Sequence, residues 1–257
     1  MKVHWLEQTK QDLPEENDWL SAGEISFLSR LRFAKRSADW RLGRWTAKHA
    51  VAAYLNLPRS PQALSRLEIR PARSGAPEAF CENKSAAVSI SVSHSENRAL
   101  CVVAPPAIDL GCDLELIEPR SDAFLSDYFT AQEQALVMRE PVPNRPLLLT
   151  LFWSAKESAL KALCEGLRLD TRSVIVAPVD LPSGLHDWSP LEVRCDAGKI
   201  FRGWWQNGNQ MVRTVVAAPP PEPPVRLEVP AHPRERIFES LPGDKPTEGR
   251  VSTTEPQ

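Results

Sequence analysis

The chain has 257 residues, 42% of them hydrophobic and 25% charged, which are ordinary proportions for a globular protein. A formal net charge of −2 argues against binding of nucleic acid over the whole surface, and no apolar run is long enough to span a membrane. Residues 1–19 lack the apolar segment of a secretory signal, and the five cysteines are scattered without a Cys-x-x-Cys pair, so we expect a cytoplasmic protein with reduced thiols.

The N-terminal part predicts one long helix followed by strands. Residues 26–57 carry an apolar stripe at steps of seven and four, and Pro58 ends the predicted helix. Residues 88–92 and 99–103 are two expected strands joined by a short turn. After the Pro105-Pro106 break, residues 107–115 are a third.

The C-terminal part repeats this order. Two short helices are expected at 123–129 and 133–138, and a stronger one at 147–163. Strands then follow at 173–177, 191–195, 200–206 and 210–217. Helices followed by strands in both parts indicate an α+β fold.

These patterns divide the chain at its proline-rich segments. We expect an N-terminal α+β subdomain at residues 1–106 and a C-terminal one at 107–218. Residues 219–257 contain many prolines and no apolar periodicity, which is typical of a flexible tail. The weakly apolar segments Leu227–Val229 and Ile237–Leu241 leave open that one short piece docks on the body.

The sequence Asp113-Leu114-Glu115 places two carboxylates on one face of a strand. Two like charges at this spacing are unfavourable unless a cation neutralises them, and hard oxygen ligands suit Mg²⁺. Taken alone, the pair also fits an ordinary solvated strand edge.

A second candidate group lies on the helix predicted at 147–163. Trp153, Glu157 and Lys161 follow one another at steps of four and share one face, opposite the apolar stripe. Taken alone, the pattern favours a solvated Glu–Lys pair, although a large aromatic side chain on a polar face usually covers something.

Two further candidates come from the N-terminal part. Ser93-His94 follows a strand, where the histidine could act as a base, contact a phosphate or simply end the strand. Adjacent Ser and His in a strand point in opposite directions, which disfavours a serine hydrolase. Residues 30–48 carry seven basic side chains and one acid, so they form either a phosphate-binding face or a solvated one.

Together these motifs resemble the Sfp-type 4′-phosphopantetheinyl transferase family. Gly111-Cys112-Asp113-Leu114-Glu115 and the segment from Trp153 to Lys161 resemble its central signature. Ser93-His94, the segment Phe129-Thr130-Ala131-Gln132-Glu133, and Gly43-Arg44-Trp45 with Lys48 resemble its lesser motifs. The resemblance implies two similar α+β subdomains related by a pseudo-twofold, with coenzyme A lying between them.

The resemblance also implies the reaction and its residues. The enzyme would transfer 4′-phosphopantetheine from coenzyme A to a serine hydroxyl of an acyl or peptidyl carrier protein and release 3′,5′-ADP. Mg²⁺, or Mn²⁺, would be held by Asp113, Glu115 and Glu157, and the catalytic residues would be Glu157, Lys161 and Asp113. Coenzyme A would be bound by Lys35, Arg36, Arg44, Lys48, Ser93, His94, Lys156 and Lys161.

Further expectations are a monomer with no nucleic-acid or membrane partner. The family's Gly-Lys-Pro motif reads Gly75-Ala76-Pro77 here, and Arg73 is one candidate to replace the missing lysine. Two alternatives stay open, namely a coenzyme A- or carrier-binding protein without catalysis and a basic-helix nucleic-acid module.

Overall fold

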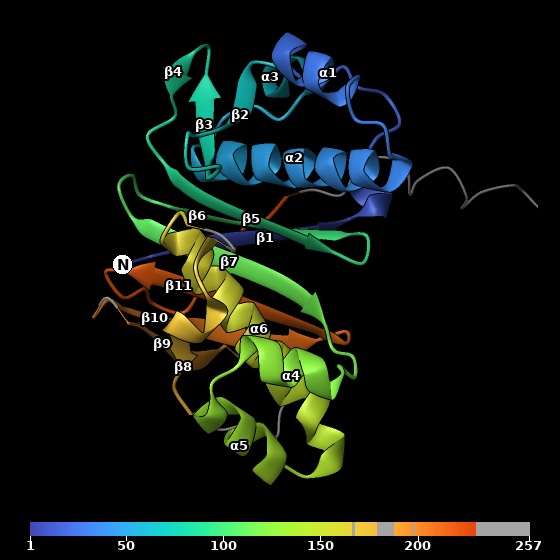
Figure 1. Cartoon of the computed structure of the whole chain (residues 1–257). Coiled ribbons are helices and arrows are strands. Elements are labelled where there is room, and N and C mark those ends of the chain that lie inside the picture. Colours follow the sequence, from blue (N-terminus) through green and yellow to red (C-terminus); the bar gives the residue numbers. More distant parts are fainter. Residues whose placement is uncertain (166–167, 179–187, 197, 230–257) are drawn as a thin grey trace, which may run out of the picture.

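The computed structural model describes residues 1–165, 168–178, 188–196 and 198–229 (Figure 1). The N-terminal half contains β1 (His4–Thr9), α1 (Ala22–Leu28), α2 (Ala34–Tyr54), α3 (Pro61–Leu64), β2 (Leu67–Pro71), β3 (Pro77–Cys81), β4 (Lys84–Ser85), β5 (Ser89–Ser95) and β6 (Arg98–Ala104). The C-terminal half contains β7 (Asp109–Leu116), α4 (Asp122–Tyr128), α5 (Ala131–Arg139), α6 (Arg145–Ala162), β8 (Val174–Val176), β9 (Ser189–Cys195), β10 (Ile200–Gly208) and β11 (Met211–Ala218). A last short strand, β12 (Val225–Arg226), follows.

Two β-sheets face each other at the centre of the molecule. The first has the strand order β12-β1-β6-β5 and the second β7-β11-β10-β9-β8, while β2, β3 and β4 form a small third sheet. Helix α2 covers the outer face of the first sheet and α6 the outer face of the second (Figure 1). The result is a helix–sheet–sheet–helix arrangement, which confirms the α+β class expected from the sequence.

Each half repeats one topology. In both sheets, the first strand of the half pairs with its last strand, which pairs with the strand before it: β1-β6-β5 and β7-β11-β10. The long helix follows the first strand in both halves. Because β1 was not expected, the sequence predicted only helices before the strands of the N-terminal half. The structure shows that both halves begin with a strand.

The long helix expected at residues 26–57 is two helices, α1 and α2. Ser21 and Glu24 form a capping box that starts α1 before the expected boundary. Phe33 then caps α2 in an extended conformation, and its side chain is 72% exposed. The apolar stripe therefore begins later than predicted, because periodicity alone does not locate a break between two consecutive helices.

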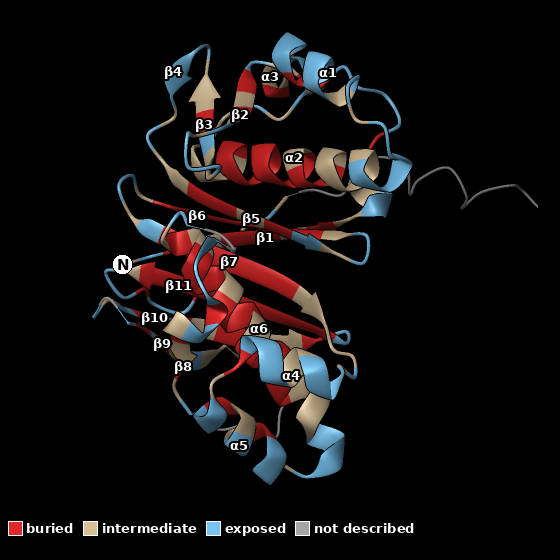
Figure 2. Ribbon diagram, viewed as in Figure 1, coloured by how far each residue is buried: buried red, intermediate tan, exposed pale blue. Residues whose placement is uncertain are grey.

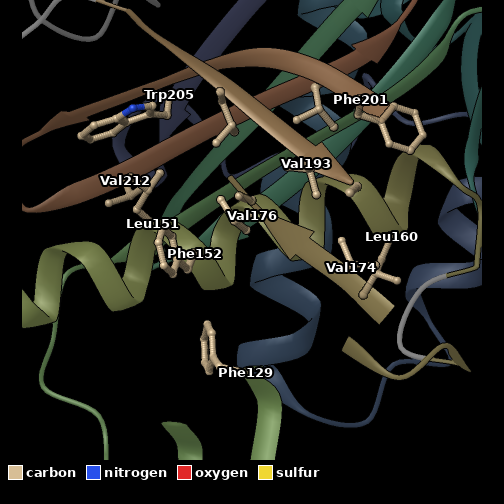
Figure 3. Close-up of a cluster of buried hydrophobic side chains, with 14 of the residues drawn as sticks. Phe129, Leu151, Phe152, Leu160, Val174, Val176, Val193, Phe201, Trp205 and Val212 are labelled. Atoms are coloured by element: carbon tan, nitrogen blue, oxygen red, sulfur yellow. The ribbon is translucent and has the colours of Figure 1, made fainter. Parts of the chain in front are cut away.

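The core of the C-terminal half lies between α6 and its sheet. Phe152 and Leu160 from the helix meet Val193 and Trp205 from the strands (Figure 3). Figure 2 shows that α2 and α6 are buried where they face the sheets, whereas α1, α4 and α5 are largely exposed. No helix among the described residues is long and apolar enough to cross a membrane.

The interface between the two sheets has an apolar centre and an ionic end. Leu100, Val102, Leu114 and Val215 belong to a buried cluster shared by both sheets. Beyond this cluster, Arg213 of β11 donates through Nη2 to Glu7 of β1 at 2.9 Å, and Arg98 donates to the same carboxylate at 3.0 Å. Because Arg213 and Glu7 are both nearly buried, this contact ties the two halves together.

A buried lysine–glutamate pair stabilises each half in the same way. In the C-terminal half, the Lys156 ammonium lies 2.9 Å from Glu133 and also donates to two backbone carbonyls. Glu133 in turn accepts the backbone N–H of Val176. In the N-terminal half, Lys48 and Glu24 repeat this arrangement.

The repeated pairs reveal a repeat in the sequence that the sequence analysis missed. Trp45-Thr46-Ala47-Lys48 in α2 corresponds to Trp153-Ser154-Ala155-Lys156 in α6. The aromatic partner is repeated as well, since Lys48 lies over the Trp19 ring and Lys156 over the Phe129 ring. The two halves therefore share their packing as well as their topology.

Residues 219–229 are packed on the body, so the expected tail is not flexible from Pro219 onward, and the docking of Leu227–Val229 that the sequence left open is observed. Strand β12 pairs in parallel with β1, and the Leu227 N–H donates to the Trp5 carbonyl at 2.8 Å. Leu227 and Val229 pack against the core of the N-terminal half. The proline content did not prevent this, because the exposed edge of β1 offers backbone partners to a short extended segment. Residues 230–257 of the expected tail lie outside the described residues.

We expect two truncations of this segment to differ. A chain ending at Ala218 loses the β12 ladder and the packing of Leu227 and Val229, and its free energy of unfolding should fall by about 1–3 kcal/mol. A chain ending at Val229 keeps these contacts and should unfold within about 0.5 kcal/mol of the full chain. Urea unfolding measures the difference, and equal stability of the two truncated chains would contradict the packing of this segment.

Candidate active site

The candidate site lies where β7 packs against α6. Asp113 and Glu115 lie on the same face of β7, as their spacing predicted. Gly111 allows this close contact, because a Cβ atom there would lie 1.8 Å from the backbone oxygen of Ser158 in α6. A residue without a Cβ is therefore required before the two acids, because only such a residue lets the acidic strand pack this closely on the helix.

Asp113 and Lys161 form the centre of the site. The Lys161 ammonium donates to Asp113 Oδ1 at 2.7 Å and to the Ser93 hydroxyl at 3.1 Å. Ser93 donates to the same carboxylate oxygen at 2.7 Å. Burial alone would lower the pKa of Lys161, but the nearby negative charge of Asp113 raises it overall, so the ammonium stays protonated. Since Ser93 belongs to β5, the centre joins both halves.

Glu115 lies beside Asp113 between a guanidinium and an indole. Arg120 donates to one carboxylate oxygen at 3.3 Å, and Trp153 donates to the other at 3.3 Å. Burial, followed by the negative charge of Asp113, raises the pKa of Glu115 to about 7. Trp153 also packs edge-on against Phe124 and Tyr128, so this side of the site is an aromatic wall.

Glu157 faces the same group of charges from α6. Its side chain is half-buried, and burial together with the charge of Asp113 raises its pKa. Lys161, one turn further along the helix, opposes that rise. A carboxylate with a raised pKa accepts a proton more readily, so Glu157 is suited to act as a base.

The carboxylates fit a hard divalent cation. Asp113 Oδ2 is buried and has no hydrogen-bond partner among the described residues. Burial and their neighbour Asp113 raise the pKa of Glu115 and Glu157, so an added positive charge would be favourable here. As the side chains stand, no three acidic, His or Cys groups of the described residues are placed to hold an ion. Lys161 and Arg120 engage two of these carboxylates instead.

One cavity reaches this centre through Lys161, and a second cavity lies next to the first. The first, of about 660 Å³, runs between the halves and is lined by Gly75, Pro77, Ser91, Lys161 and Arg168, among other residues. The second, of about 610 Å³, shares Gly75 and Pro77 with the first. Their common wall makes them neighbouring compartments along one surface.

The second cavity gathers four of the residues predicted to bind coenzyme A, together with one acid, Asp39. Its lining includes Lys35, Arg36, Arg44 and His94. Arg44 stacks over the Trp40 ring at 5.0 Å, and its Nε is buried without a hydrogen-bond partner among the described residues. Burial lowers the pKa of Arg44, because its guanidinium is poorly solvated. Such a cluster is suited to an anionic group.

Lys48 and Lys156 do not belong to this site, which corrects their predicted role in binding coenzyme A. Both side chains are fully buried in ion pairs with Glu24 and Glu133. Each ammonium also donates to two backbone carbonyls, so its three protons are used inside the protein. The sequence showed basic residues at helical spacing but not that these two face the core.

Several residues of the site were missed from the sequence. Arg120 and Arg168 were not singled out, because isolated arginines in loops carry no pattern. The buried role of Glu24 could have been found from the capping-box spacing Ser21–Glu24 and from the repeat around Lys48. Arg73, the candidate replacement for the lysine missing at position 76, is not in the lining of either cavity, whereas Arg168 lines the first.

The lysine–carboxylate centre lies between two repeated α+β halves, next to cavities that gather basic side chains, and such side chains suit an anionic ligand. Residues 109–198 match the family model of the 4′-phosphopantetheinyl transferase superfamily. This part of the chain is similar to that superfamily.

Two known proteins are similar to the chain. The 4′-phosphopantetheinyl transferase HetI of Nostoc sp. is 27% identical over 215 residues, which cover 78% of this chain and 86% of HetI. The crystal structure of Helicobacter pylori holo-[acyl-carrier-protein] synthase in complex with coenzyme A matches with a TM-score of 0.28 and 16% identity. That match covers 40% of this chain and 98% of the synthase.

Proposed function

We propose that the protein transfers 4′-phosphopantetheine from coenzyme A to a serine hydroxyl of an acyl or peptidyl carrier protein and releases 3′,5′-ADP. The observation that carries this proposal is the position of Lys161, which lies in the wall of the first cavity and binds Asp113. A substrate in that cavity therefore reaches the carboxylate centre. Similarity to the 4′-phosphopantetheinyl transferase superfamily and to HetI supports the same reaction.

The residues divide between binding and proton transfer. Lys35, Arg36, Arg44 and His94 hold the 3′-phosphate end of coenzyme A in the second cavity. Lys161 lies close to the pyrophosphate, where its charge stabilises the phosphoryl group during transfer. The serine oxygen forms a new bond to the phosphorus that carries pantetheine. The bond from that phosphorus to the bridging oxygen breaks, and its electron pair leaves with 3′,5′-ADP.

Glu157 takes the serine proton, directly or through a water molecule. Burial and the charge of Asp113 raise the pKa of Glu157, whereas a cation held by the same carboxylate would lower it, which favours the route through a water molecule. Asp113, Glu115 and Glu157 would hold Mg²⁺ or Mn²⁺. When bound, the ion neutralises charge on the pyrophosphate oxygens. Membership of the Sfp-type group, a cytoplasmic location and a monomeric state stay predictions.

The proposed reaction is tested on a carrier protein in its unmodified form. Incubation with the enzyme, coenzyme A and Mg²⁺ should add one phosphopantetheinyl group, and peptide mapping should locate it on the carrier serine. A carrier in which that serine is replaced by alanine is the control and should keep its mass. If a panel of acyl and peptidyl carriers bound the enzyme but none was modified, a binding protein without catalysis would be the better description.

A further inference from the structure

Arg168 lies in the loop after α6, on the wall of the first cavity, and its guanidinium reaches across to the other half. Its Nη2 donates to the Ser74 carbonyl at 3.4 Å, in the loop that precedes β3. Further bonds run to the carbonyls of Cys164 at 3.0 Å and Glu165 at 3.0 Å. Arg168 is thus held at the cavity mouth by backbone oxygens.

The charge of Arg168 is poorly compensated by the protein. Among the described residues, the nearest carboxylate is that of Glu165 at 3.8 Å, and both side chains are largely exposed. No acceptor for Nη1 is found among the described residues. Lys161, the other cation of this wall, is committed to Asp113. Among the described residues that line the first cavity, Arg168 is therefore the cation that still has hydrogen-bond donors available to a ligand.

The position of Arg168 also fits a ligand that spans both cavities. Gly75, the residue after Ser74, lines both cavities. The lining also contains Glu78, Asp109 and Glu165. Asp109 is paired with Lys199, whereas Glu78 and Glu165 would repel an anionic substrate. A molecule with phosphate groups at two separate places would pass this point, and the Arg168 guanidinium offsets part of this negative charge.

We propose that Arg168 is a substrate-binding residue that holds a phosphate group of coenzyme A at the junction of the two cavities. This proposal rests on the proposed function. It assigns a contact with the substrate to the loop that follows α6 in the C-terminal half. The planar guanidinium can donate two parallel bonds to phosphate oxygens.

The test measures coenzyme A binding and turnover in the full-length chain. Arg168→Gln should raise the Kd and KM for coenzyme A by about tenfold, because a charge-assisted contact is lost. The KM for the carrier protein and kcat should stay within about twofold. Arg168→Lys keeps the positive charge and should recover part of the affinity. Arg172→Gln is the matched control, since Arg172 is exposed, pairs with Asp170 and is not in the lining of either cavity.

Dephospho-coenzyme A, which lacks the 3′-phosphate, identifies the group that is bound. An equal loss with both molecules assigns Arg168 to the pyrophosphate, and a loss confined to coenzyme A assigns it to the 3′-phosphate. An unchanged Kd in Arg168→Gln, or the same change in Arg172→Gln, would overturn the proposal. Failure of the proposed function is seen separately, since the unaltered chain would then bind no coenzyme A or modify no carrier.

Discussion

Replacing Asp113 by asparagine should lower kcat/KM for phosphopantetheine transfer by at least about a hundredfold. The substitution keeps the shape of the side chain but removes the negative charge that holds Lys161 and faces Glu115 and Glu157. A steady-state assay with a carrier protein measures the loss. The free energy of unfolding should change by no more than about 1–2 kcal/mol, because the Lys161 side chain is 28% exposed and can be solvated.

The matched control is Asp196→Asn, at an exposed acid that follows β9. This variant should keep its activity. If Asp113→Asn turned over coenzyme A as fast as the unaltered chain, Asp113 would not belong to the catalytic centre. If it failed to fold, its loss of activity would say nothing about chemistry, so circular dichroism and urea unfolding accompany the assay.

Replacing Lys156 by methionine should lower the free energy of unfolding by about 3–5 kcal/mol. The substitution leaves the fully buried Glu133 carboxylate without its cation and two backbone carbonyls without a donor. Urea denaturation with an unchanged m-value measures the effect. We expect a similar loss for Lys48→Met, since Lys48 makes the equivalent contacts with Glu24.

Lys199→Met provides the comparison for an exposed ion pair. Lys199 contacts Asp109 at the surface, and its removal should cost less than about 1 kcal/mol. The double variant Lys156→Met with Glu133→Gln should lose less stability than the two single losses added together, because no unpaired charge is then left buried. If Lys156→Met lowered the free energy of unfolding by less than about 1 kcal/mol, the buried pair would not be needed for the stability of the C-terminal half.

The acidic part of the site could be predicted from the sequence because its geometry is local. Asp113 and Glu115 share a strand face and Glu157 and Lys161 share a helix face, whatever the tertiary structure. What the sequence could not show is which basic residues of a helix face inward. Arg44 lines a cavity while Lys48, one turn later, is buried against Glu24. That difference depends on the packing of α1 and β2 against α2, which no local pattern records.

Part of the fold could also be predicted from the sequence. Strands β5 and β6, and the helix α6, follow clear apolar patterns and lie close to their expected positions. Strand β1 was missed because its six residues carry both polar and aromatic side chains. Its role becomes visible only through its partners, since it pairs with β6 on one side and β12 on the other. Pairing between segments that are distant in the sequence depends on the tertiary structure, which local patterns do not show.

The repeat also shows which residues of the carboxylate centre helix α2 lacks. At the positions equivalent to Glu157 and Lys161 of α6, helix α2 carries His49 and Ala53. The buried Lys–Glu pairs are kept in both halves, so the shared features are those that hold the helix to its sheet. The proposed chemistry depends on Glu157 and Lys161, which α2 does not repeat.

The most direct test of the proposed catalytic centre follows both products in one reaction. Wild-type enzyme, coenzyme A, Mg²⁺ and an unmodified carrier protein are incubated, and released 3′,5′-ADP and modified serine are quantified together. We expect one 3′,5′-ADP for each modified serine, with both products nearly abolished in parallel by Asp113→Asn. Release of 3′,5′-ADP without serine modification, or equal yields from the two enzymes, would contradict transfer at this centre.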